Sequence, residues 1–153
     1  ATPVNNRLTP AAVLAACAKV CFRSTVLPRH LGIDGRADDA FALSCFTDGV
    51  PHVWQRTPMN QTYLTENGLG RVAVEMKLSW SSPLKAGDVV LVATGITGCN
   101  AKTFTMRHHL FEARTNRLAA VCDVVALAMD LNTRRAVEIP EATKKEMARQ
   151  AMQ

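Results

Sequence analysis

The side chains best suited to chemistry are a few carboxylates and histidines, and none of them belongs to a familiar short motif. Asp34 lies in the polar loop 32–36, which reads G-I-D-G-R. A loop carboxylate can take a proton from water, but an Asp-Gly turn also occurs without any function. His108 shares one strand face with apolar residues, which predicts a position in the core. The sequence therefore allows two interpretations of His108, a functional group or an ordinary buried histidine.

The spacing of the other reactive residues argues against several classes of site. The five cysteines contain no C-x-x-C pair, and His30 and His52 lie far apart with no carboxylate or cysteine at ligand spacing. We therefore expect no metal site. The chain has no G-x-G-x-x-G, no P-loop and no G-x-S-x-G, which argues against nucleotide enzymes of those classes and against an α/β serine hydrolase.

The composition is that of one soluble domain. The chain has 153 residues, of which 48% are hydrophobic. No stretch reaches the roughly 18–20 uninterrupted apolar residues of a membrane span, so we expect no membrane segment. An odd number of cysteines without C-x-x-C pairs favours a reducing compartment, and we expect a cytoplasmic protein.

The chain is basic, with 18 Lys and Arg against 13 Asp and Glu, and a net charge of +5. This balance favours an anionic partner: nucleic acid, an acidic lipid surface or a small ligand that carries phosphate. The basic residues are scattered and only 5% of residues are aromatic. Because neither a basic stripe nor stacking platforms can be recognised, we expect no nucleic-acid partner.

The first half of the chain predicts two helices around a strand. Thr9 as N-cap and Pro10 at the first helical position begin a helix that runs to about residue 18. Residues 20–26 are rich in β-branched and aromatic side chains and predict a strand. A helix follows from Asp38 or Asp39 through Phe46, and Gly49 and Pro51 are expected to weaken or end it.

The second half predicts strands joined by turns. In 71–79, Val72, Val74, Met76 and Leu78 alternate with polar residues, Arg71 among them, so that one face is buried. Turns at 83–88, 98–100 and 114–117 separate strands at 89–97, 104–111 and 118–131, and 140–152 reads as a charged helix. The order predicts an α+β fold, in which one helix faces an antiparallel meander within a sheet of about five strands.

This order, together with the segments 70–76, 84–88, 102–108 and 129–131, resembles the hotdog-fold acyl-CoA thioesterases of the 4-hydroxybenzoyl-CoA thioesterase type. The resemblance covers about residues 20–140. It implies a curved antiparallel sheet wrapped around a central helix. The chain then forms a single hotdog domain, with an N-terminal helical extension at 1–19, the core at 20–140 and a C-terminal helix at 141–153.

The same resemblance implies partners. Hotdog subunits join at least as dimers, so we expect a homodimer or homotetramer with the thioester in a tunnel between subunits. The substrate would be an acyl-CoA or acyl-carrier-protein thioester. No cofactor is expected, because CoA is part of the substrate.

The loop departs from the family at the residues that matter most. Family members commonly read D-x-x-G-H there, and this chain has Gly32 in place of the Asp and Arg36 in place of the His. A glycine can neither attack a carbonyl nor activate water. Asp34 lies two residues on and could replace the missing carboxylate. Asp48 is a third candidate, since some hotdog thioesterases use a helix carboxylate, although a polar residue near a helix end needs no function.

The predicted site therefore combines catalytic and binding residues. Asp34 and His108 would share a water, with Asp48 as the alternative base. Gly35, Arg36 and Phe41 would bind the substrate, although Arg36 is otherwise an ordinary solvated arginine. The leading hypothesis is hydrolysis of an acyl-CoA thioester to a carboxylic acid and CoA. The alternative is a degenerate hotdog domain that binds an acyl thioester or a partner protein without turnover, and a hotdog dehydratase or hydratase is weaker.

Overall fold

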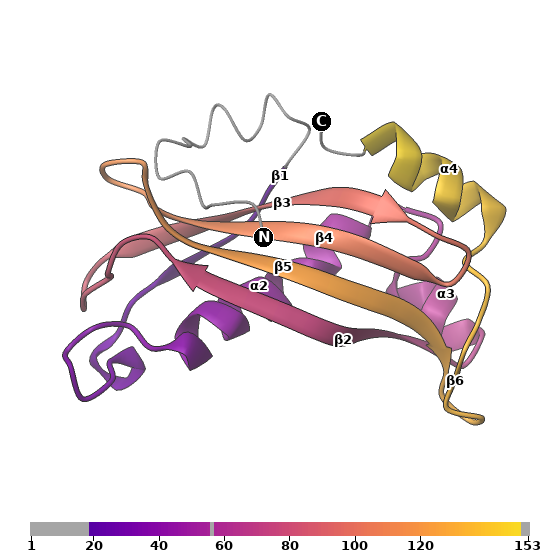
Figure 1. Ribbon diagram of the computed structural model, residues 1–153, viewed down its shortest axis with the longest axis horizontal. Coiled ribbons are helices and arrows are strands. Elements are labelled where there is room, and N and C mark those ends of the chain that lie inside the picture. The colour runs from indigo at the N-terminus through magenta and orange to yellow at the C-terminus, as the bar shows by residue number, and fades with distance from the viewer. Residues whose placement is uncertain (1–18, 56, 151–153) are drawn as a thin grey trace.

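The computed structural model describes residues 19–55 and 57–150, so the helix predicted near the N-terminus lies outside the described residues. One curled sheet and three α-helices make up this part of the chain (Figure 1). In chain order the elements are β1 (Lys19–Thr25), the 3-10 helix η1 (Pro28–His30), α2 (Asp39–Trp54), α3 (Gln61–Glu66), β2 (Leu69–Trp80), β3 (Val89–Cys99), β4 (Thr103–Glu112), β5 (Arg117–Asp130), β6 (Arg135–Ala136) and α4 (Glu141–Gln150).

The sheet has the strand order β1-β3-β4-β5-β2, and every pairing is antiparallel. The expected meander of four strands is wrong for its first member, because β2 pairs with β5 and not with β3. Two-strand hairpins use loops of about 2–5 residues, whereas residues 81–88 form a longer connection. Hydrogen bonds from Val26 N to Asp88 O and from Ala37 N to Leu84 O tie this connection to the segments around η1.

Helix α2 lies against the inner face of the sheet, as a central helix should (Figure 1). Asp38 caps its first turn by accepting a hydrogen bond from Phe41 N at 2.8 Å. The helix does not stop at Gly49 or Pro51 as predicted, but continues to Trp54. Proline removes one backbone donor, yet the next turn closes through the bond from Gln55 N to Pro51 O, and the complete burial of Trp54 favours it.

The main core lies between α2 and the sheet, and a second cluster lies on the opposite face. The side chains of the main core include Phe46, Trp54, Phe104 and Leu110. The second cluster consists of Leu91, Ala93, Phe111, Leu118 and Val121. Strand β5 is therefore apolar on both faces, which confirms the prediction of a central strand for this segment.

Strand β2 contains a β-bulge that changes which residues face inward. Ala73 lies opposite Ala126 and Glu75 opposite Val125, so Val74 is the extra residue, and its side chain is 55% exposed. The predicted face of Val72, Val74, Met76 and Leu78 is therefore wrong in its first half. The inward-facing residues of β2 lie opposite the core residues of β5, and they are Arg71, Ala73, Met76, Leu78 and Trp80.

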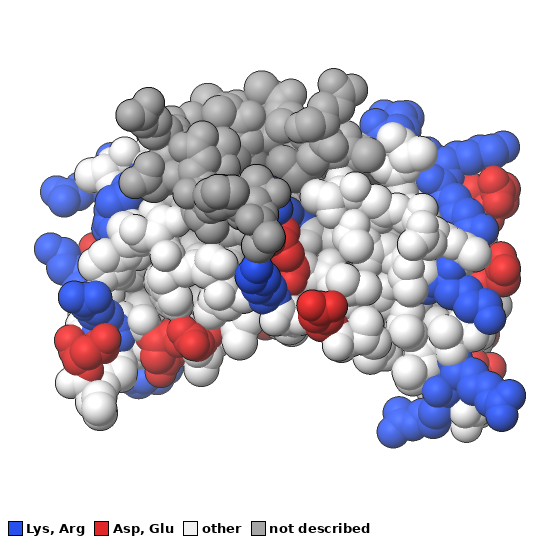
Figure 2. Space-filling model, in the orientation of Figure 1, with Lys and Arg blue, Asp and Glu red and all other residues white. Residues whose placement is uncertain are grey.

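Charged side chains gather at the two ends of the molecule in the view of Figure 2, and a smaller group of basic and acidic side chains lies near the centre of this view. Lys and Arg are frequent where α4 and β6 lie. Within residues 19–55 and 57–150, no helix combines the length and the apolar character needed to cross a bilayer.

Candidate functional site

The loop before α2 folds into a tight hairpin that presents Asp34. Leu31 and Ala37 form a β-bridge, and Gly32 N donates to Arg36 O at 2.7 Å. Gly35 has a φ of 76°, a left-handed conformation that suits glycine at the tip of the turn. The Asp34 carboxylate is exposed and accepts a hydrogen bond from Arg36 N at 3.1 Å.

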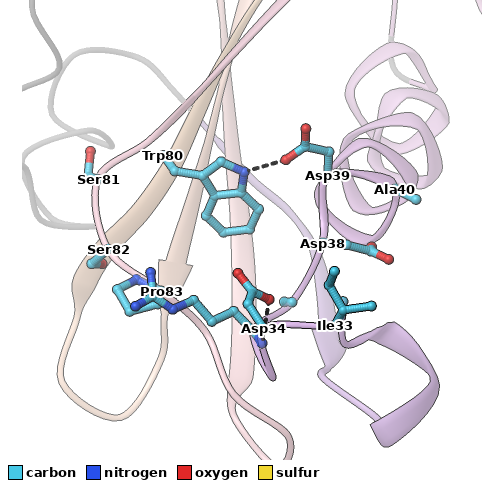
Figure 3. A pocket seen from close by; sticks show the side chains of 12 residues that line it. Ile33, Asp34, Asp38, Asp39, Ala40, Trp80, Ser81, Ser82 and Pro83 are labelled. Carbon is cyan, nitrogen blue, oxygen red and sulfur yellow. Dashed lines mark hydrogen bonds between the residues drawn. The ribbon is translucent and has the colours of Figure 1, made fainter.

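This hairpin forms one wall of a cavity of about 720 Å³, which we call the loop pocket (Figure 3). The first turn of α2 and the end of β2 form its other walls. Trp80 extends from β2 across the pocket, and its Nε1 donates to Asp39 Oδ1 at 2.7 Å. The lining residues are Gly32, Ile33, Asp34, Arg36, Ala37, Asp38, Asp39, Ala40, Trp80, Ser81, Ser82 and Pro83.

The carboxylates of the loop pocket have different tasks. Asp38 is engaged as the N-cap of α2, whereas Asp39 is held by the indole of Trp80. Sequence reasoning treated Asp38 and Asp39 only as alternative caps. The Trp80–Asp39 pair joins residues 41 positions apart, so no local pattern indicated it.

A second cavity, of about 450 Å³, lies between α2, α3 and the inner face of β2, β5 and β4. We call it the sheet cavity. Its lining is mostly apolar and comes from Val50, Pro51, Leu64, Leu69, Gly70, Ala73, Met76, Phe104, Met106, Val124, Ala126 and Leu131. Thr47, Gln61, Arg71 and His108 supply the polar groups. An apolar cavity with a few polar side chains is the usual form of a small-molecule site.

His108 lies at the wall of the sheet cavity and is only 1% exposed. Its ring stacks on Phe46 with centroids 5.1 Å apart, and Nδ1 lies 2.6 Å from Thr94 Oγ1. Burial, with a smaller effect of nearby His109, lowers the pKa of His108 to about 4. The imidazole is therefore neutral at pH 7, so it can form hydrogen bonds but is only a weak base.

Arg71 is the polar residue that sequence reasoning assigned to the wrong face. The bulge turns it inward, where its guanidinium carbon lies 5.4 Å from the centre of the Trp54 ring. Its Nη1 donates to Met59 O at 2.8 Å. No signal in the sequence indicated this orientation, because the β-bulge that causes it leaves no mark in an alternating pattern.

The structure separates the predicted site residues. Asp34 and Arg36 line the loop pocket, Gly35 shapes the hairpin, and His108 lines the sheet cavity. Asp34 and His108 are thus not brought into one cavity. Asp48 and Phe41 line neither of these cavities, but lie in a smaller pocket of about 360 Å³ between α2 and β1.

Asp48 lies near Cys45, whose pKa is raised to about 11 by burial and by this carboxylate. Phe41 is 3% exposed and packs against His30 at 4.6 Å between ring centroids. Their predicted roles stay predictions. Among the described residues, no group of three or more His, Cys, Asp or Glu side chains could hold a metal ion.

The amino-acid sequence matches the model of a known protein family. The model of the thioesterase-like superfamily matches residues 26–147, which is most of the chain. The chain belongs to the thioesterase-like superfamily. No curated protein sequence matches it.

Solved structures of this superfamily's fold resemble the chain closely in shape. A hypothetical protein from Staphylococcus aureus in complex with CoA has a TM-score of 0.76 and 19% identity, over 87% of this chain and 84% of that one. A 1,4-dihydroxy-2-naphthoyl-CoA thioesterase from Synechocystis has a TM-score of 0.70 and 16% identity, over 83% and 93%. A gentisyl-coenzyme A thioesterase has a TM-score of 0.71 and 18% identity, over 81% and 98%. These likenesses confirm the hotdog fold.

Proposed function

We propose that this superfamily member hydrolyses acyl-CoA thioesters, with the acyl group in the sheet cavity and the thioester at the loop pocket. The carrying observation is the placement of an apolar cavity and a carboxylate-bearing pocket along the same helix and the same strand. Ala40 of α2 and Trp80 of β2 line the loop pocket, whereas Thr47 and Met76 of those elements line the sheet cavity.

The direction of the substrate follows from the way α2 runs along β2. Asp39 at the start of the helix bonds Trp80 at the end of the strand, and Trp54 at the helix end contacts Arg71 near the strand start. The two elements are thus antiparallel. A substrate that enters by the loop pocket would extend its acyl group toward Arg71 and leave the CoA portion outside.

The loop pocket offers carboxylates for activating water. Asp34, or Asp39 held by Trp80, would take a proton from water as the oxygen attacks the thioester carbon. The first N–H groups of a helix have no intrahelical acceptor, and Asp39 and Ala40 line this pocket. One of these N–H groups would stabilise the oxyanion of the tetrahedral intermediate. Its collapse expels the CoA thiolate, which takes up a proton.

His108 would act inside the sheet cavity as a neutral hydrogen-bonding group. Its partner Thr94 and its stacking on Phe46 fix the ring in one orientation. A fixed, neutral imidazole can orient a polar atom of the substrate or a water molecule, but a conjugate acid with a pKa of about 4 makes it a weak base at pH 7.

A second copy of the chain would complete the site. Strand β2 is a sheet edge among the described strands, and it exposes Val74 (55%) and Met76 (40%) beside the sheet cavity. An exposed apolar edge is a natural surface for pairing with another strand. Joining two sheets along β2 would enclose the sheet cavity between subunits.

The test is thiol release from a panel of short, branched, aromatic and long acyl-CoA esters. The variants are Asp34→Asn, Asp39→Asn and, as a matched control at the helix face away from both cavities, Asp48→Asn. We expect the wild type to turn over at least one ester, and one of the first two variants to lose about 100-fold in kcat while the control keeps its activity. A loss of activity confined to Asp48→Asn would identify Asp48 as the base and contradict its assignment to the loop pocket.

The alternative function is acyl-thioester binding without turnover, and the specific observation that favours it is Gly32. Saturable binding of an acyl-CoA by calorimetry, with no thiol release from any ester, would replace the enzyme proposal with this one.

A further inference from the structure

The end of the sheet cavity farthest from the loop pocket carries a half-buried arginine among apolar side chains. Arg71 lines this cavity with Leu69, Ala73, Leu64 and Leu131. In the described part of the chain, no carboxylate lies within 4.0 Å of its guanidinium. Burial lowers the pKa of Arg71 to about 10, so it remains a cation at pH 7.

The contacts of Arg71 within the protein use only part of its capacity. A guanidinium has five N–H donors, and Met59 O accepts one of them. The Trp54 ring offers its face to the cation. Neither partner is an anion, and removing a cation from water is costly unless it is paired. The planar guanidinium fork matches carboxylates and phosphates, and of these two groups a carboxylate is the one that can end an acyl chain.

Arg71 and His108 mark the two ends of the sheet cavity. Both residues lie opposite strand β5, where Arg71 pairs with Ala128 and His108 pairs with Cys122. Six residues of a strand span about 20 Å. The apolar walls between these positions, from Met76 to Ala126, would surround the middle of an acyl group whose far end reaches the guanidinium.

We propose that the preferred substrates are CoA thioesters whose acyl group ends in a carboxylate, and that Arg71 selects them by binding that carboxylate. This inference rests on the proposed function for the direction of the substrate. It makes Arg71 a specificity-determining residue of the acyl site, with no part in the bond-breaking step.

The experiment compares hexadecanedioyl-CoA with palmitoyl-CoA, which have equally long chains that can span the sheet cavity and differ in a terminal carboxylate against a methyl group. The enzymes are the wild type, Arg71→Met, Arg71→Lys and the control Arg114→Met, an exposed arginine in the β4–β5 turn. We expect the wild type to favour hexadecanedioyl-CoA in kcat/KM. Arg71→Met should lose about 10- to 100-fold of that preference, the factor of a charge-assisted hydrogen bond, while palmitoyl-CoA turnover is kept.

The remaining outcomes separate this inference from the proposed function. Wild-type turnover of both esters without preference would overturn the role of Arg71 and leave the thioesterase proposal intact. If neither ester is hydrolysed, calorimetric binding of the same two esters decides the inference, while the enzyme proposal fails. An equal loss of affinity for both esters and for free CoA in Arg71→Met would assign Arg71 to the CoA phosphates and overturn the inference. If Arg71→Met does not fold, Arg71→Lys takes its place. It keeps the cation but lacks the planar fork, so the preference for the terminal carboxylate should fall.

Discussion

At the scale of single residues, Gly32 bears most directly on catalysis because it stands where the family commonly has a carboxylate. Its backbone is not left-handed, since the positive-φ glycines among the described residues are Gly35, Gly68 and Gly87. A Cβ at Gly32 would come within 3.3 Å of Asp34 Oδ1, the end of an exposed side chain that accepts a hydrogen bond from Arg36 N. A larger residue therefore fits if the Asp34 carboxylate shifts slightly.

We predict that Gly32→Asp raises kcat/KM for acyl-CoA hydrolysis by about 10- to 100-fold, because it adds a general base at the family's position. Thiol release measures the effect. Gly32→Asn is the matched control, with the same shape and no basicity. Equal rates for the Asp and Asn variants would contradict the prediction.

The burial of His108 predicts a pH-dependent stability. Its pKa is about 4 in the folded state and about 6.5 when unfolded. The unfolded chain therefore binds a proton that the folded chain does not, and the free energy of unfolding falls as the pH decreases from 6.5 to 4. The full loss is about 3 kcal/mol for this residue.

Urea unfolding at pH 7.5 and pH 4.5 measures this slope. His109 is also buried with a lowered pKa, so the comparison requires a variant. His108→Gln should be less stable than the wild type at pH 7.5, and its stability should fall less on acidification. A variant with the wild-type slope would show that His108 takes up its proton in the folded state as well.

At the scale of elements, α2 carries both cavities on one helix that contains an internal proline. Pro51 is exposed and has no N–H to donate to the preceding turn. We predict that Pro51→Ala raises the free energy of unfolding by about 1–2 kcal/mol, since the restored hydrogen bond outweighs the greater freedom of the unfolded chain. Urea unfolding at pH 7.5 tests it. A decrease would show that the proline already fits the helix without loss.

The elements could be predicted where the pattern is local. Strand β5 is apolar on both faces, and Asn116, with a φ of 57°, forms the turn that its sequence predicted. The pairing of β2 with β5 could not be predicted, because it depends on a long connection and not on the strand's own residues. Helix α2 passes Pro51 because its last turn is anchored by the buried Trp54, a tertiary effect.

The candidate site divides in the same way. The loop with Asp34 and Arg36 could be predicted, since an Asp-Gly turn is encoded by adjacent residues. The inward orientation of Arg71 and the Trp80–Asp39 bond could not, because each depends on where a distant segment lies. The burial of His109, which is 1% exposed beside Phe111 on the outer face, depends likewise on the strands that surround it.

At the scale of the whole molecule, the proposed dimer places the acyl site at the β2 edge. We predict that Val74→Lys gives a monomer in analytical ultracentrifugation and lowers kcat/KM at least about 10-fold, because a charge on an edge strand opposes strand pairing. Val89→Lys, at an exposed position (46%) on β3, is the matched control and should keep the wild-type mass. A dimeric Val74→Lys protein would show that the subunits meet elsewhere.

The bulge at Val74 divides β2 into two segments, in which the alternation of inward and outward side chains is shifted by one residue. On the side of Trp80, the strand presents the wall shared with the loop pocket, and on the side of Arg71 it presents the far wall of the sheet cavity. If the same residues paired with β5 without the bulge, the strand would keep the first wall and invert the second, so that Val72 pointed inward and Arg71 outward. The one unpaired residue of the bulge thus makes the difference between a cavity that ends in a cation and one that is closed by hydrocarbon, and it leaves the pocket proposed for the thioester unchanged.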